Sequence, residues 1–368
     1  MTAPHVMLVN GSLCGGGAEH VIATLAKHLR DTGHQITIAA VHDGGEVLEE
    51  LKTAGHTTVT TGAGRGSSMA LRRVIEERGV QIVHSHDLRS LIDAGVCRLR
   101  SRRVAHMHTF HFGNYPQLPW KHLLMERLAA RLPDRLVAVG NAQRASIVKA
   151  MALSDTRVRT LWNGVDYVSR PDWAGVDRHA GLPRIGSLST FGEQKGLPTL
   201  LQAAKIARDR GARFRLVLVG AGPMRGELEA MAAGLGLTDC VEFTGWKPDA
   251  AATLLPTFDI FVQSSYWEAM SVVILEAMAA RRPIVATAVG ENTALLKNGE
   301  SAILVPPRDA DALAQALMLV IADVHLRAQL ADAAHAIYTS RFTGRAMADR
   351  YATAYRECLV ARGPAAEQ

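Results

Sequence analysis

Two carboxylates flank a helix start in the segment Y266-W-E-A-M-S-V-V-I-L-E-A-M-A-A280. Glu268 falls in a turn after the apolar run Ile260–Val262, and Glu276 follows eight positions later. The apolar run around Glu276 predicts a helix over Ser271–Ala280. A helix N-terminus attracts phosphate, whereas carboxylates accept hydrogen bonds from sugar hydroxyls. The segment therefore suits a nucleotide sugar, with hydroxyls at the two acids and the diphosphate at the helix start.

The composition is that of a globular protein of two domains. The chain has 368 residues, of which 48% are hydrophobic and 21% charged. A net charge of +6 fits an anionic ligand or an anionic membrane face. Aromatic residues are not interleaved with basic ones as in proteins that bind single-stranded nucleic acid, so no nucleic-acid partner is expected.

Cysteine usage and hydropathy predict a cytoplasmic protein. Cys14, Cys97, Cys240 and Cys358 lie far apart and form no C-x-x-C pair, which predicts neither a zinc site nor a disulfide framework. The first ten residues lack the basic region of a signal peptide, and no run approaches 18 apolar residues. Peripheral attachment to the inner face of the plasma membrane remains compatible with these features.

Short apolar strands alternate with helical patterns twice along the chain. In the first half, strands are predicted at His5–Val9, Gln35–Ala40, Ile82–His84, Val104–Met107, Leu136–Val139 and Val158–Leu161. In the second half they are predicted at Arg184–Leu188, Phe214–Val219, Val241–Thr244, Ile260–Val262, Ile284–Thr287 and Ala302–Val305. Helices are predicted over 18–30, 196–210, 224–233 and 345–360. The alternation indicates an α/β chain with two Rossmann-like, doubly wound parallel sheets facing a cleft.

A glycine run and a set of histidines follow predicted strands. The run G15-G-G-A-E19 opens the first helix and lets backbone approach a ligand, but it is not the G-x-G-x-x-G pattern of nicotinamide enzymes. His84 and His86 end one strand, and H106-M-H-T-F-H111 ends another. The strand period of two places His106 and His108 on one face. No third convergent ligand accompanies His84 and His86, so no metal is expected.

The E-x7-E spacing, the sequence L275-E-A-M-A279 and the strand Pro283–Thr287 (PIVAT) resemble glycosyltransferase family 4. Members of this family are retaining, nucleotide-sugar-dependent enzymes with the two-domain GT-B fold. The resemblance implies transfer of a hexose-type sugar from a UDP- or GDP-linked donor to a hydroxyl of a glycan or lipid-linked glycan. A bacterial cell-envelope or exopolysaccharide product is implied, without a cofactor or a metal.

The resemblance also implies domain limits and residue roles. It implies an acceptor-side domain over 1–168, a donor-binding domain over 169–344 and a last segment, 345–368, that returns to the first domain; residues 167–183 form a polar, Gly/Pro-bearing linker. The implied catalytic residues are Glu268, His108, His111 and Lys195. The implied donor-binding residues are Gly16, Gly17, Ser187, Lys195, Gly220, Gly222, Ala269, Met270, Ser271 and Glu276.

Two histidines compete for one role in this scheme. The family has a histidine at a strand end that contacts the transferred sugar. The sequence T109-F-H111 resembles the family's T-x-H, whereas counting from the strand start favours His108. Both remain candidates.

The chain departs from the family pattern at several positions. Ser187 stands where an arginine is usual, Ala269 and Arg281 stand where glycines are usual, and no glutamate stands at Ala294. The departures at Ser187, Ala269 and Ala294 keep a non-catalytic nucleotide-sugar-binding protein open as an alternative. A nucleotide-sugar 2-epimerase of the same fold, which would lack an acceptor, is a second alternative.

Overall fold

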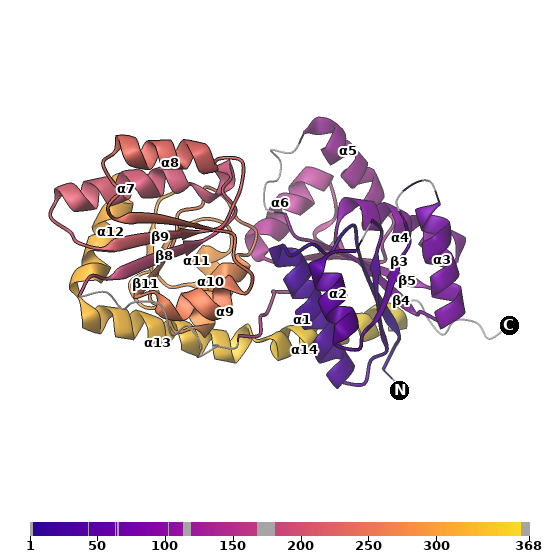
Figure 1. The fold of residues 1–368 in the computed structure, drawn as a ribbon. Helices are drawn as coiled ribbons and strands as arrows, with labels where there is room; N and C mark the ends of the chain where they lie inside the picture. The colour runs from indigo at the N-terminus through magenta and orange to yellow at the C-terminus, as the bar shows by residue number, and fades with distance from the viewer. Residues whose placement is uncertain are drawn as a thin grey trace. The chain divides into compact units, whose positions relative to one another are not determined.

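The structure is a computed structural model that describes residues 3–42, 44–62, 64, 66–101, 103–112, 119–167 and 181–361. The chain divides into two compact units (Figure 1). Unit 1 comprises residues 1–164 together with 343–368, and unit 2 comprises residues 165–342. These divisions fall a few residues before the predicted limits at 168 and 344. Most of the predicted linker, residues 168–180, lies outside the described residues.

Unit 1 is built on a parallel sheet. Its strands are β1 (Val6–Asn10), β2 (Ile36–Ala40), β3 (Thr57–Thr60), β4 (Ile82–Ser85), β5 (Ala105–Phe110), β6 (Arg135–Ala138) and β7 (Val158–Thr160). They are arranged in the order β3-β2-β1-β4-β5-β6-β7, so the sheet is doubly wound about β1 and β4, as predicted. Only β3 was not predicted, because T57-T-V-T60 has no alternation of apolar and polar residues and forms a partly exposed edge strand.

Helices cover this sheet, and the last helix of the chain belongs to the same unit. The helices are α1 (Gly17–Asp31), α2 (Glu46–Thr53), α3 (Ser67–Arg78), α4 (Leu88–Arg100), α5 (Trp120–Ala129), α6 (Asn141–Met151) and α14 (Gly344–Val360), with a 3-10 turn, η1 (Asp155–Arg157). α14 packs along α1 (Figure 1) and buries Tyr351 and Tyr355. The Tyr355 hydroxyl lies 2.7 Å from His84 Nδ1, so a residue of β4 anchors the C-terminal helix.

Unit 2 repeats the architecture with a six-stranded parallel sheet. Its strands are β8 (Arg184–Leu188), β9 (Arg215–Val219), β10 (Val241–Gly245), β11 (Ile260–Gln263), β12 (Ile284–Thr287) and β13 (Ile303–Val305). Their order is β10-β9-β8-β11-β12-β13. Every predicted strand of the second half is confirmed. The sheet order reverses between β8 and β11, and ligands of open α/β sheets bind at the carboxyl ends of strands at such a point.

The helices of unit 2 pack against the sheet and bury a large apolar core there. They are α7 (Leu197–Asp209), α8 (Arg225–Gly234), α9 (Ala250–Leu254), α10 (Val272–Ala279), α11 (Asn292–Leu295), α12 (Ala310–Ala322) and α13 (Val324–Arg341), with 3-10 turns η2 (Glu193–Lys195) and η3 (Leu255–Thr257). In the described residues no single helix is long and apolar enough to cross a membrane. Among these residues, only α12 and α13 taken together have the length and apolar composition of a membrane span, and the angle between the two helices is 104°.

Candidate active site

The loops after the adjacent strands β8 and β11 bring a lysine and a glutamate into direct contact. Lys195 Nζ lies 2.6 Å from Glu268 Oε1, and Ser265 Oγ donates to the same oxygen at 2.8 Å. The Glu268 side chain is 7% exposed and that of Lys195 is 20% exposed. A buried carboxylate needs such partners, because burial removes its hydration. The two predicted catalytic groups of this unit therefore form one polar centre.

Backbone contacts fix the two loops relative to each other. Tyr266 N donates to Gln194 O at 2.7 Å, and Ser264 Oγ donates to Lys195 O at 2.9 Å. Gly196 has φ +59°, and a Cβ there would lie 2.1 Å from Ser264 O. The glycine after Lys195 is therefore required by the close approach of the two loops.

The N-terminus of α10 follows this centre along the chain. Ser271 is its N-cap, and Ser271 Oγ accepts a hydrogen bond from Ile274 N at 3.4 Å. Gln263 Nε2 donates to the same oxygen at 2.6 Å, and Asn292 Nδ2 donates to Gln263 Oε1 at 2.8 Å. Gln263 and Asn292 thus hold the helix start in place. Sequence reasoning missed both, because nothing in their spacing signals a contact between β11 and α11.

Glu276 lies one turn into α10, on its less buried face. Val272 and Val273 share that face and are half-buried, whereas Ile274 and Leu275 are fully buried. The sequence predicts a buried acid from the surrounding apolar run. The structure corrects this expectation, because Glu276 is only half-buried. It lies on the same side of α10 as Val272 and Val273.

Ala269 and Met270 are buried in the loop between Glu268 and α10. Ala269 O accepts a hydrogen bond from Glu291 N at 3.1 Å, and a Cβ on Gly290 would lie 2.1 Å from Glu268 O. Ala269 itself has no positive φ, so the alanine in place of the family's glycine introduces no backbone strain there. Arg281, also at a usual glycine position, does have φ +52° and pairs with Asp332 at 2.6 Å.

The remaining donor-side candidates of unit 2 lie at the ends of β8 and β9. Ser187 is buried within β8 beside Leu218 and supplies no positive charge. A Cβ on Gly220 would lie 1.8 Å from Ser189 O, and one on Gly222 would lie 2.5 Å from Phe191 O. Both glycines are thus required by packing of the turn after β9 against the loop after β8. Their contact with a donor remains a prediction.

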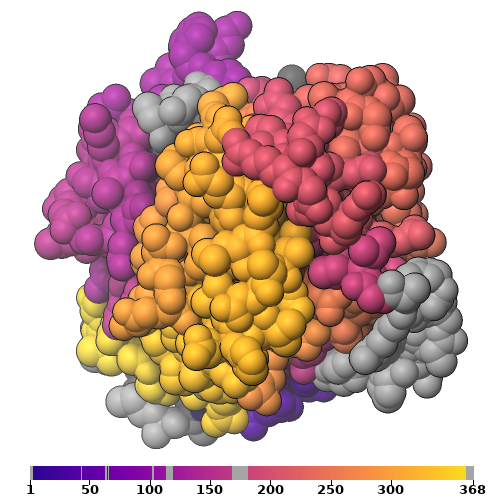
Figure 2. Space-filling view, turned by 90° about the vertical axis from the view of Figure 1, so that its left-hand side faces the viewer, coloured from indigo at the N-terminus to yellow at the C-terminus, as the bar shows by residue number. Residues whose placement is uncertain are grey.

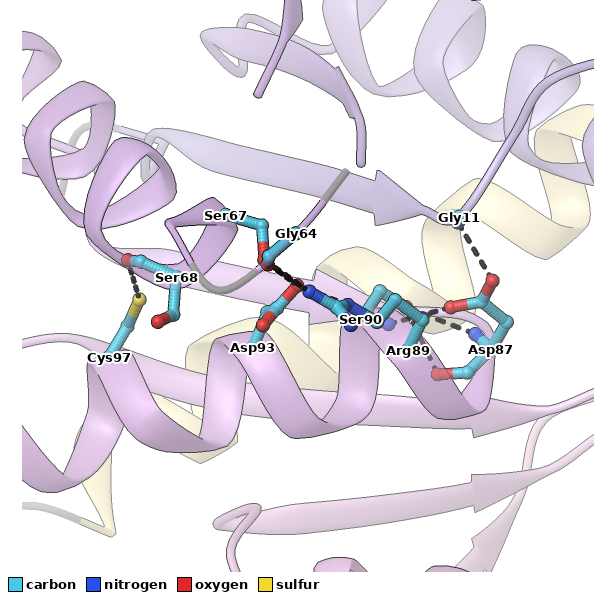
Figure 3. Close-up of polar contacts among 9 residues, drawn as sticks. All are labelled: Gly11, Gly64, Ser67, Ser68, Asp87, Arg89, Ser90, Asp93 and Cys97. Carbon is cyan, nitrogen blue, oxygen red and sulfur yellow. Dashed lines mark hydrogen bonds and ion pairs between the residues drawn. The ribbon is translucent and has the colours of Figure 1, made fainter. Parts of the chain in front are cut away.

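In unit 1 the glycine run forms the start of α1. Gly16 is the N-cap and has no side-chain cap, and Gly17 is the first helical residue. The loop before it is anchored by Gly11 N, which donates to Asp87 Oδ2 at 2.8 Å (Figure 3). Asp87 also caps α4 by accepting a hydrogen bond from Ser90 N at 2.7 Å. This aspartate, which follows His86, therefore positions the loop that leads to the predicted phosphate-binding glycines.

Helix α4 carries a second cluster of polar side chains near its start. Arg89 Nε donates to Asp93 Oδ2 at 3.0 Å, and Ser67 Oγ donates to the same oxygen at 2.8 Å (Figure 3). These contacts tie α4 to the start of α3.

The histidines of β4 and β5 form a buried cluster. His106 Nε2 and His108 Nδ1 lie 2.8 and 2.9 Å from Ser85 Oγ, which confirms that these two histidines share a face. His111 follows the end of β5, is half-buried, and has Nε2 3.0 Å from His86 Nδ1. Of the two competing histidines, His108 is thus 1% exposed within the strand, whereas His111 stands at its carboxyl end.

Burial keeps these imidazoles neutral. It lowers the pKa of His106 to about 3 and the pKa of His111 to about 4. Burial also lowers the pKa values of His84, His86 and His108 well below the usual value, and the neighbouring histidines add to the shift. His108 and His111 line a pocket of about 210 Å³ together with His122 and Glu126. Neutral imidazoles there can exchange hydrogen bonds with hydroxyl groups.

The histidine cluster is not arranged as a metal site. Throughout the described part of the chain, no group of three or more His, Cys, Asp or Glu side chains is placed to hold a metal ion, and this includes the histidines of β4 and β5.

Comparison with known proteins assigns both units to one kind of enzyme. Residues 15–168 match the family described as Glycosyltransferase Family 4, and residues 182–323 match Glycosyl transferases group 1. A D-inositol 3-phosphate glycosyltransferase of Acidothermus cellulolyticus is 30% identical over 317 residues, which cover 78% of this chain and 69% of that protein.

Two further similarities support the same assignment. A lipopolysaccharide core biosynthesis glycosyltransferase of Rhizobium meliloti is 34% identical over 197 residues, covering 54% of this chain and only 56% of that relative's length. A crystal structure of Anabaena HepE in complex with UDP and glucose has a TM-score of 0.86 at 21% identity, covering 96% of this chain and 100% of that one, and shows the fold. The chain therefore belongs to glycosyltransferase family 4 and has the GT-B fold.

Proposed function

We propose that this protein transfers a hexose-type sugar, with retention of anomeric configuration, from a nucleoside-diphosphate sugar to a hydroxyl of a cell-envelope or exopolysaccharide glycan. The observation that carries the proposal is the Lys195–Glu268 contact of 2.6 Å, between the loops after β8 and β11 and next to the capped start of α10. A cation, a carboxylate and a helix N-terminus there match a diphosphate with sugar hydroxyls attached.

The residues take separate roles in this scheme. Lys195 and the first N–H groups of α10 stabilise the negative charge that develops on the leaving nucleoside diphosphate. Glu268 accepts hydrogen bonds from the sugar hydroxyls, and Glu276 accepts them from the ribose. The bond between the anomeric carbon and the diphosphate oxygen breaks as the acceptor oxygen bonds to that carbon. The acceptor proton passes to the departing phosphate oxygen, so retention needs no protein nucleophile. Lys195 and the helix supply the charge that a metal supplies in other transferases.

The histidines of unit 1 have a sugar-side role in the proposal. His111 is favoured over His108 as the direct contact, because His111 follows the end of β5 and His108 is buried within it. Gly16 and Gly17 offer the backbone N–H groups at the start of α1 to an anionic ligand in this scheme.

The comparisons support the choice of donor and product class. One relative is named for lipopolysaccharide core biosynthesis, and structurally similar chains were crystallised with UDP and UDP-glucose. We therefore expect a UDP-hexose as the first donor to test and a glycan, or a lipid-linked glycan, as the acceptor.

A thermal-shift panel of UDP-, GDP-, ADP- and dTDP-sugars tests the proposal, followed by product analysis with the donor that stabilises most. A new α-linked product with an α-linked donor supports a retaining transferase. Inversion at the anomeric carbon contradicts retention. Conversion of UDP-GlcNAc alone to its 2-epimer supports the epimerase, and stabilisation without turnover over a range of acceptors supports a binding protein.

Replacing Glu276 with alanine is expected to weaken nucleoside-diphosphate binding about 10- to 100-fold while changing kcat at saturating donor much less. Ribose hydroxyls bind equally in the ground state and the transition state, and hydrogen bonds to a charged group contribute about 1.5–3 kcal/mol. Isothermal titration with UDP and GDP measures the loss. Glu229→Ala on α8, an exposed glutamate paired with Arg225, is the control. Equal affinities of Glu276→Ala and the unaltered protein place the ribose elsewhere.

A stripe of exposed apolar residues on α5 supports peripheral membrane contact. Trp120, Leu124 and Leu128 follow at intervals of one turn and are 70, 47 and 60% exposed. Lys121 and Arg127, which are exposed beside them, carry positive charge. An exposed apolar stripe flanked by basic residues suits the headgroup region of an anionic membrane.

Introducing glutamates at Leu124 and Leu128 together is expected to abolish cosedimentation with phosphatidylglycerol vesicles, because it replaces apolar contact with like-charge repulsion. Transfer to a soluble acceptor should continue. Leu319→Glu on α12, at a leucine that is 50% exposed, is the matched control. Vesicle binding that survives the double substitution removes α5 as the attachment site.

A further inference from the structure

A pocket of about 360 Å³ opens at the amino-terminal edge of the unit 2 sheet. Arg184 begins β8, Arg215 begins β9, and Asp259 directly precedes β11, and all three line the pocket. Because the sheet is parallel, this edge is opposite the carboxyl ends where Lys195 and Glu268 meet. The pocket is therefore separate from the proposed donor site.

Four arginines line this pocket: Arg184, Arg215, Arg282 and Arg327. Arg327 comes from α13, which lies on the face of unit 2 that is coloured yellow-orange in Figure 2. The guanidinium groups are charged at all accessible pH values. The one carboxylate in the lining, Asp259, accepts a hydrogen bond from Arg184 N at 2.8 Å through Oδ2. The lining therefore carries an excess of positive charge.

Two of the arginine side chains donate hydrogen bonds to backbone carbonyl groups of unit 2. Arg282 donates to Ala280 O and Phe258 O at 2.9 and 3.0 Å. Arg327 donates to Val320 O and Ile321 O, at the last turn of α12, at 3.1 and 2.9 Å. Their charges are thus fixed at the pocket wall by backbone contacts.

The other two arginines are available to a ligand. The Arg184 guanidinium lies 5.9 Å from the centre of the Phe258 ring, and its Nε is buried without a hydrogen-bond partner. Arg215 is exposed. Within the described residues no carboxylate forms an ion pair with Arg184, Arg215 or Arg327. Charges of one sign gathered in a pocket repel one another, and a bound anion relieves that repulsion.

We propose that this pocket binds a small phosphate-bearing anion, a phosphate ester or a diphosphate, at a site independent of the sugar donor. Guanidinium groups match phosphate oxygens with paired hydrogen bonds. The volume exceeds what a single phosphate fills, and the apolar part of the wall, with Phe258 and Pro256, leaves room for the group that the phosphate carries.

Titration of the full chain with inorganic pyrophosphate at low salt tests the proposal, with Arg215→Glu and Arg184→Gln as variants. Each variant is expected to weaken binding at least tenfold, the effect of losing one charge-assisted hydrogen bond of about 1.4 kcal/mol or more. Arg213→Glu is the matched control, because Arg213 is exposed two residues earlier and does not line the pocket. Lys195→Ala, measured in parallel, should weaken pyrophosphate binding at the donor site and leave the Arg215-dependent binding intact.

A second arm separates soluble from lipid-borne phosphate. Phosphatidylglycerol vesicles that bind in an Arg215-dependent manner, and are displaced by pyrophosphate, identify a lipid headgroup as the source. Pyrophosphate binding without such vesicle binding identifies a soluble phosphate ester. Unchanged affinity in both variants, or an equal loss in Arg213→Glu, overturns the proposal. Circular dichroism spectra that match the unaltered protein show that each variant is folded.

Discussion

Lys195→Ala is expected to lower kcat/KM by about 100-fold or more and to weaken nucleoside-diphosphate binding about tenfold or more. Ser187 is buried and uncharged at the position where the family usually has an arginine, so Lys195 is the charged side chain assigned to the diphosphate. Removing it also takes from the buried Glu268 carboxylate its partner at 2.6 Å. The loss should therefore be larger in turnover than in ground-state affinity. Steady-state kinetics and calorimetric titration measure the two effects.

Lys205→Ala on α7 is the matched control for this variant. Lys205 is also a lysine paired with a carboxylate, Asp209, but the pair lies on the surface one helical turn apart. Such exposed pairs contribute little, so Lys205→Ala should behave as the unaltered protein. A Lys195→Ala protein with normal nucleotide affinity and normal turnover would place the diphosphate away from the loop after β8.

The Lys195–Glu268 contact also affects which ligand the site prefers. In the structure the two side chains satisfy each other, together with Ser265 Oγ at 2.8 Å from Glu268 Oε1. A diphosphate that draws on Lys195 leaves Glu268 needing new hydrogen-bond donors, and the hydroxyls of the transferred sugar are such donors. A nucleoside diphosphate without a sugar lacks them. The pair thus provides a physical reason for the site to prefer the complete donor.

The fold could be predicted from the sequence because its strands are apolar and regularly spaced. In unit 2 all six strands were predicted, and β8, β9, β11 and β12 at the centre of its sheet are largely buried. In unit 1, β3 could not be predicted, since T57-T-V-T60 owes its strand to pairing with β2 at the sheet edge. Pairing of this kind depends on the neighbouring strand, so it cannot be predicted from the local sequence pattern alone.

The candidate site was predictable only in part. Glu268 and Ser271 were identified from the residues around the predicted helix start, and Lys195 from the resemblance to the family. The structure brings Lys195 into contact with Glu268. Gln263 and Asn292, which hold Ser271, are far apart in sequence and belong to no motif. The burial of Glu276 was overestimated because an apolar run does not reveal which face of a helix turns outward.

The sequence alone could also not decide between His108 and His111 as the sugar-contacting histidine. Their roles depend on whether β5 ends before or after Phe110, and a strand boundary is the least certain part of a prediction. In the structure β5 ends at Phe110, so His108 turns to Ser85 inside the sheet and His111 begins the following loop.

The protein is expected to lose stability steeply as the pH falls from about 7.5 to about 5.5, because unit 1 buries neutral histidines. Burial lowers the pKa of His106 to about 3, that of His111 to about 4, and those of His84, His86 and His108 well below the usual value. In the unfolded chain a histidine takes up a proton near pH 6.5. Stability is therefore complete above about pH 6.5 and declines below it toward the folded-state pKa values. Each such histidine contributes about 1.4 kcal/mol of destabilisation over this range.

Urea unfolding followed by circular dichroism at the two pH values, at constant ionic strength, measures the change. Even two of these histidines remove about 3 kcal/mol, a large part of the 5–15 kcal/mol typical of a folded domain. His106→Gln keeps a hydrogen-bonding group beside Ser85 and should reduce the pH dependence by the share of one histidine. His325→Gln, at an exposed position of α13, should leave it unchanged. A free energy of unfolding that is the same at both pH values would mean that the cluster accepts protons without unfolding, and its imidazoles would then be free to carry charge in the reaction.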